Sequence, residues 1–293
     1  MTTSRSSDTS TTRLLERGHT LGVIGMGVMG QTLLKGLLDA KAIAPAQAWG
    51  TSRSRATCEK VAAELNVPVQ PDISSHLSQT DVVLLCVKPA QAAVALNTLK
   101  STPGLRPDAL LISIVAGVRL RDLAAHLGTD NPWVRAMPNT PCVVGEGMTA
   151  IAGGERATPE HLARARQVFE CVGQCVETDE RHFNAITALS GSGPAYQYLI
   201  MEAMADAGVR VGLPRDLALT LVAQTALGAA RMVQTSGRHP AALRDDVTTP
   251  AGCTIGGLLM LEDGKVRSVL ARAIEEATRI AATLGSTPPA EGA

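Results

Sequence analysis

The stretch Leu21-Gly22-Val23-Ile24-Gly25-Met26-Gly27-Val28-Met29-Gly30 decides the fold. Its first four residues predict a short buried strand, and the next six have the spacing GxGxxG. Leucines then recur at helical spacing, at Leu33, Leu34, Leu37 and Leu38. A strand, a glycine turn and a helix in this order favour dinucleotide binding over an ordinary glycine turn. The glycines permit a tight turn, and backbone N–H groups at the helix start can bind a pyrophosphate.

Strands that alternate with helices follow this stretch as far as about residue 179. Asp81–Val87 and Ala109–Val115 are continuous apolar runs, typical of parallel strands that are buried on both faces, and Gln91–Leu99 between them predicts a helix. Shorter strands are expected at Ala48–Thr51, Val134–Met137, Thr149–Ala152 and around Val176. The predicted class is α/β, with an N-terminal Rossmann-type doubly wound sheet.

The remainder of the chain predicts only helices. One runs from Pro194 to Ala207 with Gly208 as its cap, one begins with Pro214 at its first position, and two more cover Thr254–Glu262 and Val266–Leu284. We therefore predict a disordered tail at residues 1–18, a Rossmann domain at 19–179 and an all-α substrate and dimerisation domain at 180–293. Because this half is rich in small residues, we expect a second subunit to complete its core.

Composition excludes several classes of function. The 27 basic and 27 acidic residues cancel, and only six residues are aromatic, so neither a nucleic-acid surface nor an aromatic stacking platform is expected. No apolar run is long enough to cross a membrane, and residues 1–17 have no apolar core of a secretory signal. The six cysteines and six histidines have no metal-binding spacing. We expect a cytoplasmic protein with reduced cysteines and no structural metal.

The end of the second predicted strand indicates which dinucleotide binds. NAD sites place an acidic residue there for the ribose hydroxyls, but no acid occurs between Lys41 and Cys58. Ser52 and Arg53 stand there instead, and a guanidinium is a bidentate partner for a 2′-phosphate. NADPH is therefore predicted in preference to NADH, which is left open. For Arg55 the alternative of a solvated basic turn is kept.

Two segments combine a potential helix cap with a proline, namely Ser190–Pro194 and Thr248–Thr254. Each is expected to present hydroxyls and free backbone N–H groups at a helix start, where a carboxylate binds well. The alternative is two ordinary caps. The density of small residues favours a site for a small ligand.

At these segments the chain resembles the pyrroline-5-carboxylate reductases. The likeness extends from about Leu21 to Leu284. It is carried by the GxGxxG turn and by Val87–Pro89, Met137–Pro141, Gly145–Gly147, Ala188–Tyr196, Glu202–Gly208 and Asp245–Thr254. The resemblance implies reduction of a small imine, L-1-pyrroline-5-carboxylate, to L-proline with NAD(P)H. It also implies a homodimer formed through the helical domain and a larger ring of such dimers.

The resemblance also implies roles for individual residues. Substrate contacts are expected from Ser192, Gly193, Thr249, Gly252 and Thr254, with the Thr254 hydroxyl as the catalytic group that orients or relays the proton. The family has Gly-Gly where this chain has Ala251-Gly252, so the backbone must tolerate a Cβ there. Cofactor contacts are expected from Ile24, Gly25, Met26, Gly27, Val28, Met29, Ser52, Arg53, Cys86, Val87, Lys88, Pro89, Ala116, Gly117 and Val118.

Two other functions are alternatives. The β-hydroxyacid dehydrogenases resemble this chain in the glycine turn, but they rely on a lysine in the second domain, and Pro194–Gly208 contains none. An NADPH-binding regulator without turnover is the third reading. Lys88 is interpreted as a cofactor contact in a turn, in preference to a catalytic group, and Arg135 as a structural ion-pair partner of Glu146, in preference to a substrate contact.

Overall fold

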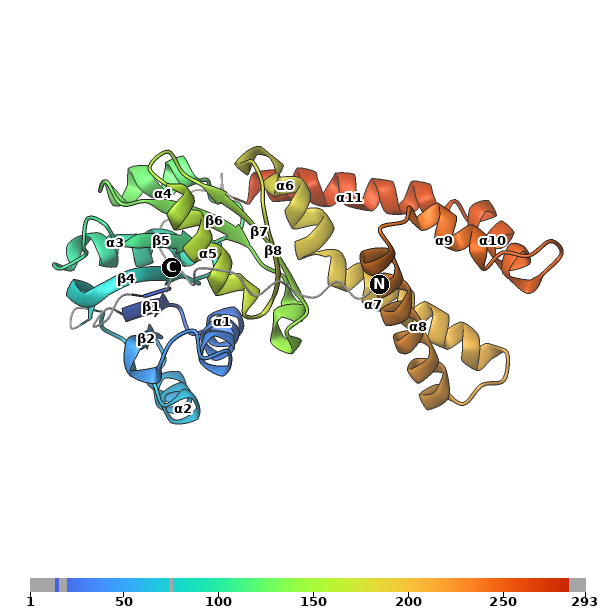
Figure 1. Cartoon of the computed structure of the whole chain (residues 1–293), viewed down its shortest axis with the longest axis horizontal. Helices are drawn as coiled ribbons and strands as arrows, with labels where there is room; N and C mark the ends of the chain where they lie inside the picture. Colours follow the sequence, from blue (N-terminus) through green and yellow to red (C-terminus); the bar gives the residue numbers. More distant parts are fainter. Residues whose placement is uncertain (1–13, 16–19, 74–75, 285–293) are drawn as a thin grey trace. The chain divides into compact units, whose positions relative to one another are not determined.

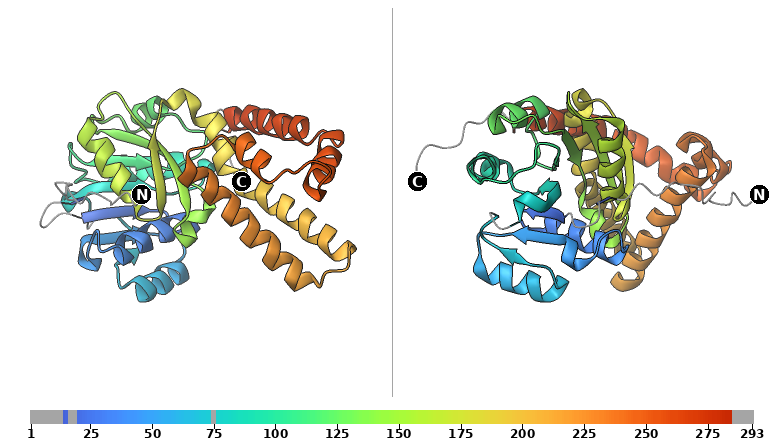
Figure 2. Two further views of the ribbon diagram at one scale, coloured as in Figure 1. Left: turned by 45° about the vertical axis from the view of Figure 1, so that its right-hand side comes forward. Right: turned by 60° about the vertical axis from the view of Figure 1, so that its left-hand side comes forward.

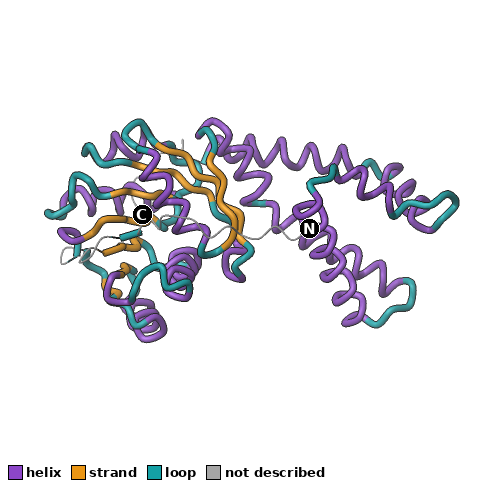
Figure 3. The backbone as a smooth tube through the Cα atoms, in the orientation of Figure 1, coloured by secondary structure: helices purple, strands orange, loops and turns teal. Residues whose placement is uncertain are grey.

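The computed structural model describes residues 14–15, 20–73 and 76–284. Among these residues eight strands form a single sheet, labelled in Figure 1 and drawn in orange in Figure 3. The strand order is β3-β2-β1-β4-β5-β6-β7-β8. The strands are β1 (Thr20–Ile24), β2 (Ala48–Thr51), β3 (Val69–Gln70), β4 (Thr80–Leu85), β5 (Leu110–Ser113), β6 (Trp133–Met137), β7 (Gly147–Gly153) and β8 (Gly173–Glu177).

The pairing confirms the predicted doubly wound sheet. β1 lies between β2 and β4 and is parallel to both, with Ile24 opposite Thr51 on one side and Leu85 on the other. The order of the strands reverses between β1 and β4, which is the switch point where such sheets bind their ligands. Among the strands that the structure describes, β6 and β7 are the one antiparallel pair, with Ala136 opposite Ile151.

Helices cover both faces of this sheet (Figure 2). On one face α1 (Val28–Asp39), α2 (Arg55–Leu65) and α5 (Pro159–Glu170) pack on apolar side chains such as Val23 and Leu84. On the other face α3 (Ala92–Ser101) and α4 (Leu120–Leu127) pack on Val83, Leu85 and Leu111. Short 3-10 segments join these elements: η1 (Pro45–Gln47), η2 (Leu77–Gln79), η3 (Pro89–Gln91), η4 (Thr140–Val144) and η5 (Glu180–His182).

Several short elements were absent from the sequence-based prediction. They include β3, α4 and α9 (Pro240–Asp246). α4 places Leu120, Leu123 and Leu127 in the core, which is helical spacing, but it has only eight residues. The strand β3 has two residues and α9 has seven, so both are too short for a clear periodic pattern.

The chain separates into two compact units, residues up to Gly191 together with those from Ala277, and Ser192–Glu276. The first unit also contains α6 (Phe183–Ile186) and the π-helix η6 (Thr187–Gly191). The second is helical, with α7 (Gly193–Arg210), α8 (Arg215–Ser236), α9, α10 (Cys253–Asp263) and the start of α11 (Val266–Thr283). The predicted domain limits at 179 and 180 stay a prediction. The predicted tail lies outside the described residues, except for Leu14 and Leu15, which are buried.

Two details of the helical unit differ from the prediction. Gly208 does not end its helix, because α7 continues to Arg210. A Cβ at Gly208 would lie 3.2 Å from the Cβ of Ala218, so this glycine lets α7 and α8 approach closely. Pro214 is the N-cap of α8 and not its first helical residue.

The helical unit has little core of its own. Within Ser192–Glu276, all of which is described, the buried hydrophobic side chains are Ala205 and Ala218. Large apolar side chains lie on its surface, among them Tyr198 at 61% exposed and Leu199 at 65%. An exposed apolar surface of this kind is typical of a protein–protein interface.

Candidate functional site

A pocket of about 510 Å³ lies at the carboxyl ends of β1, β2 and β4, at the switch point of the sheet. It contains three of the stretches predicted to contact the cofactor, namely Ile24–Gly27, Ser52–Arg53 and Cys86–Lys88. The remaining lining residues are Thr51, Ser54, Thr57, Pro71, Ile73, Ala90, Gln91, Val94, Ala95 and Thr98. The pocket therefore lies where a dinucleotide binds to a sheet of this topology.

The glycine turn has the geometry that a close ligand requires. Gly25 has φ +103°, and a Cβ there would lie 2.7 Å from the carbonyl oxygen of Cys86. Gly30 has no room for a Cβ either, because it packs against the carbonyl oxygen of Gly25. Gly27 differs, since a Cβ there would project into open space. Gly27 is also the N-cap of α1 and supplies no side chain, so the backbone N–H groups at this helix start can bind an anion.

Hydroxyl and guanidinium groups surround the end of β2. Arg53 is exposed beside Ser52, and Ser54 is the N-cap of α2, where its hydroxyl accepts a hydrogen bond from the backbone N–H of Thr57. The Sγ of Cys58 donates a hydrogen bond to the carbonyl oxygen of Ser52 at 3.3 Å, which connects the turn to α2. These groups suit a 2′-phosphate, which needs hydrogen-bond donors and positive charge.

The opposite wall of the pocket comes from α3 and from the residues after β3. Val94 and Thr98 lie one turn apart on α3, and Pro71 and Ile73 face the same space. The sequence-based prediction did not include these four residues as contacts. Their positions after the third strand and on the helix after the fourth are the signal that marks this wall. Beside it, burial raises the pKa of the Cys86 thiol to about 12, so this lining group is a neutral thiol.

Some residues predicted to contact the cofactor do not line this pocket. Val28 lies at the first position of α1 and is 74% exposed, while Met29 packs against the core. Pro89 begins η3. Ala116–Val118 follows β5. Gly117 has φ +79°, and Val118 packs on the apolar core at the sheet face that α3 and α4 cover. The roles of these residues stay predictions.

The residues predicted to bind the substrate occupy two places in the helical unit. Ser192 is the N-cap of α7 and Gly193 is its first residue. Gly252 is the N-cap of α10, and Thr254 lies at its second position. No acidic residue occupies the first turn of either helix, so each start can bind a carboxylate through its backbone N–H groups.

The turn before α10 places different demands on Gly252 and Ala251. The N–H of Gly252 donates to the carbonyl oxygen of Thr249 at 3.1 Å, and a Cβ on Gly252 would collide with Thr249 Oγ1. Ala251 has φ +57°, a left-handed conformation that favours glycine. The backbone therefore tolerates the Cβ of Ala251 in a conformation that is unfavourable for alanine.

The ion pair predicted for Arg135 is wrong. Its guanidinium bonds to Glu180 at 2.9 Å and lies over the ring of Phe183, 4.7 Å from the ring centroid. Arg135 is buried in β6, and Glu180 also accepts a hydrogen bond from the N–H of Leu120. The network joins β6, α4 and the segment that leads to α6. This is a structural role.

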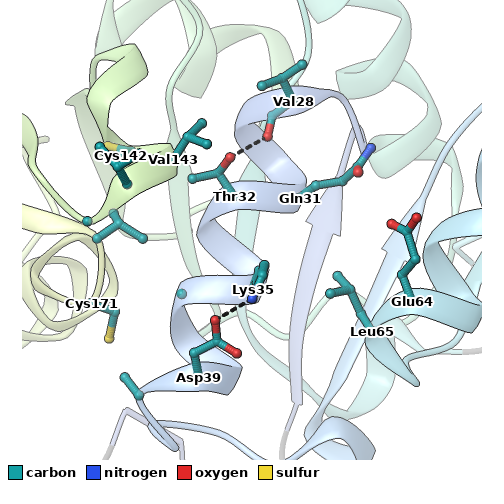
Figure 4. A pocket seen from close by; sticks show the side chains of 15 residues that line it. Val28, Gln31, Thr32, Lys35, Asp39, Glu64, Leu65, Cys142, Val143 and Cys171 are labelled. Atoms are coloured by element: carbon teal, nitrogen blue, oxygen red, sulfur yellow. Dashed lines mark hydrogen bonds and ion pairs between the residues drawn. The ribbon is translucent and has the colours of Figure 1, made fainter. Parts of the chain in front are cut away.

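A second cavity, of about 750 Å³, lies beside α1 (Figure 4). Its charged pair, Lys35 and Asp39, is bonded at 2.6 Å and is exposed at 63% and 65%. Gln31 donates to the carbonyl oxygen of Met26, and Thr32 to that of Val28. The Lys35–Asp39 pair is exposed, Thr32 bonds within α1, and Gln31 bonds to the glycine turn that precedes this helix, so these polar groups do not point to a ligand.

The described residues offer neither a metal-binding cluster nor a membrane-spanning helix. No cluster of three or more His, Cys, Asp or Glu side chains there could hold a metal ion. No helix in the same ranges is both long and apolar enough to span a membrane.

Comparison with known proteins gives matches over most of the chain. Residues 180–284 match the family model described as pyrroline-5-carboxylate reductase dimerisation, and residues 20–117 match that of the NADP oxidoreductases, coenzyme F420-dependent. A pyrroline-5-carboxylate reductase of Glycine max is 40% identical over 261 residues, which are 89% of this chain and 94% of that protein.

Solved structures agree with these matches. The pyrroline-5-carboxylate reductase of Coxiella burnetii superposes with a TM-score of 0.85 at 33% identity, over 92% of this chain and 100% of that one. The pyrroline carboxylate reductase of Plasmodium falciparum, solved with NADP bound, superposes with a TM-score of 0.80 at 31% identity. That match covers 91% of this chain and 98% of the other.

Proposed function

The chain belongs to the pyrroline-5-carboxylate reductase family, and from this membership we infer that it reduces L-1-pyrroline-5-carboxylate to L-proline, the last step of proline biosynthesis, with NADPH. The observation that carries this inference is the 40% identity to a named reductase over nine tenths of the chain. The site is consistent with it, because the pocket at the switch point of the sheet suits NADPH and the two helix starts suit a carboxylate.

The residues of the pocket fit NADPH in two respects. Gly27 leaves open the space that a Cβ would fill, at a helix start with no side-chain cap, which suits the pyrophosphate. Ser52, Arg53 and Ser54 line the pocket at the end of β2, where the 2′-phosphate of NADPH would bind. When bound, the cofactor supplies the hydride. The residues of this chain would hold and orient it.

We place the substrate carboxylate at the helix starts of the second unit. Ser192 and Gly193 would offer the N-terminus of α7, and Thr249, Gly252 and Thr254 that of α10. Fixing this carboxylate fixes the ring, and a ring held at one end presents a single face of its C=N bond. Positioning of this kind lowers the entropic part of the barrier, which is the main demand of the reaction.

Reduction of the imine does not need a strong acid from the protein. A protonated imine is already electrophilic at carbon, so the protein has to orient the ring and keep a proton on its nitrogen. The Thr254 hydroxyl suits the second task as a hydrogen-bond partner, because its alcohol pKa is poorly matched to acid catalysis near neutrality. We propose that Thr254 orients the nitrogen or a water that protonates it. A Thr254→Ala variant with unaltered kcat and KM would remove Thr254 from the site.

The protein is a homo-oligomer, as the dimerisation family model over residues 180–284 and the exposed apolar side chains of the helical unit both support. We further propose that dimers form through the helical unit and assemble into a ring, and that the enzyme works in the cytoplasm. Sedimentation of the full-length protein at micromolar concentration tests the assembly. A stable and active monomer would contradict it, and a dimer that does not associate further would contradict the ring.

The activity is tested by following NADPH absorbance with the imine and, separately, NADP⁺ or NADPH with a 3-hydroxy acid couple. We expect NADPH consumption with the imine and no turnover of the hydroxy acid. Turnover of the hydroxy acid alone would favour a β-hydroxyacid dehydrogenase. NADPH binding without turnover of either compound would favour a regulator.

A further inference from the structure

The chain enters α7 through an unusual element, the five-residue π-helix Thr187–Gly191. The π-helix is rare in proteins, and where a single π-turn does occur it is often at a functional site. This one ends immediately before Ser192, where the proposed carboxylate site begins. What holds it in place therefore bears on the geometry of that site.

The side chain of Asn139 holds the π-helix. Its Nδ2 donates to the carbonyl oxygen of Ser190 at 3.2 Å and to the Ser190 hydroxyl at 3.4 Å. Its Oδ1 accepts a hydrogen bond from the backbone N–H of Met148 at 2.8 Å. A single amide thus connects the start of β7 to the last turn of the π-helix, using its donor on one side and its acceptor on the other.

A second contact from the same segment supports this arrangement. Gly191 packs on Met137, the last residue of β6, and a Cβ on Gly191 would lie 2.7 Å from the Met137 Cε. The end of β6 and the residue that follows Pro138 thereby contact two consecutive residues of the π-helix. Both contacts lie within the first compact unit, and Ser192 is the next residue in the chain.

We propose that Asn139 is a positioning residue for the reductase reaction. Its amide fixes the Ser190 carbonyl, and this sets the direction in which the backbone of Ser192 and Gly193 presents its N–H groups to the substrate carboxylate. The proposal rests on the proposed function. It does not require Asn139 to touch the substrate or the cofactor, and Asn139 does not line the pocket at the switch point of the sheet.

The isosteric variant Asn139→Asp keeps the hydrogen-bond acceptor of the side chain and removes its donor. A carboxylate at this position still accepts from the Met148 N–H, but it cannot donate to the Ser190 carbonyl and repels it instead. We expect kcat/KM for the imine to fall by roughly tenfold, the effect of losing about one hydrogen bond and adding a repulsion. The Kd of NADPH should stay within about twofold, since the cofactor pocket lies elsewhere in the unit.

The chain offers a matched control. Asn131 lies before β6 as Asn139 lies after it, and its Nδ2 donates to the carbonyl oxygens of Arg106 at 2.7 Å and Ala109 at 3.0 Å. Asn131→Asp removes the same kind of contact and should lower the unfolding temperature while leaving kcat/KM for the imine unchanged. If Asn139→Asp does not fold, Asn139→Ser, which adds no charge, carries the same expectation.

Amide hydrogen exchange on the full-length protein provides a readout that does not depend on turnover. In Asn139→Asp, exchange at residues 187–193 should be faster than in wild type, and in Asn131→Asp it should be unchanged there. Unchanged exchange in Asn139→Asp would overturn the contact, and faster exchange with unchanged kcat/KM would overturn its role in the reaction. If wild type fails to reduce the imine, the proposed function fails first, and the exchange data then show only whether Asn139 holds the turn.

Discussion

Replacing Ala251 with glycine should stabilise the protein. Ala251 has φ +57°, and an L-residue in this left-handed conformation costs roughly 1–2 kcal/mol because its Cβ approaches the following carbonyl oxygen. Glycine removes that cost but has more freedom in the unfolded chain, which offsets about 0.4–1 kcal/mol. The free energy of unfolding should therefore rise by about 0.5–1 kcal/mol.

Urea unfolding at one fixed protein concentration measures this change, because the stability of an oligomer depends on concentration. The control is Ala223→Gly, at an exposed position inside α8, where glycine should lower the free energy of unfolding by about 1 kcal/mol. Opposite signs for the two variants would support the argument from φ. A loss at Ala251 as large as the loss at Ala223 would refute it.

Four further predictions concern residues of the first unit. Gly22→Ala places a Cβ against the buried ring of Trp49, which is held by its hydrogen bond to Thr80. The free energy of unfolding should therefore fall by about 1–3 kcal/mol. Thermal unfolding measures this change, and an unchanged Tm would contradict it. Arg53→Asp should raise the Kd of NADPH by roughly 10- to 100-fold and change the Kd of NADH little. A fluorescence titration measures both constants. An unchanged NADPH affinity would remove Arg53 from the site. The Cys86 thiol, with its pKa raised from 9.0 to about 12, should react with iodoacetamide at pH 8 far more slowly than the exposed Cys253. Because the unfolded chain loses the Cys86 proton near pH 9 and the folded chain keeps it, this group should lower the free energy of unfolding as the pH rises from 9 towards 12, which urea titrations across this range would detect.

The parts of the fold that local signals specify were predictable. β1, the glycine turn and α1 were expected because an apolar run, a turn that needs glycine and a helical leucine pattern coincide there. β4 and β5 are continuous apolar runs that are buried on both faces. The end of β2 could be assigned to the cofactor because topology alone brings it to the switch point.

Features that depend on distant partners could not be predicted. Arg135 meets Glu180 across 45 residues, and no local pattern indicates which acid a buried guanidinium will reach. Gly208 resembled a helix cap, whereas its role is to let α7 and α8 approach. The position of α3 after the fourth strand indicates that this helix borders the pocket, but which of its residues line the wall, here Val94 and Thr98, depends on which side of α3 packs on the sheet. The hydrogen bond from Asn139 to the π-helix likewise joins two residues that are 51 positions apart in the sequence.

The most direct test of the account uses the full-length wild-type protein, L-1-pyrroline-5-carboxylate and NADPH that carries deuterium at its transferable position. Mass spectrometry of the product should show one deuterium per proline, at the carbon that was doubly bonded to nitrogen, and one proline formed per NADPH consumed. NADPH that binds but is not consumed, or proline that carries no label, would contradict the reduction of an imine by this protein.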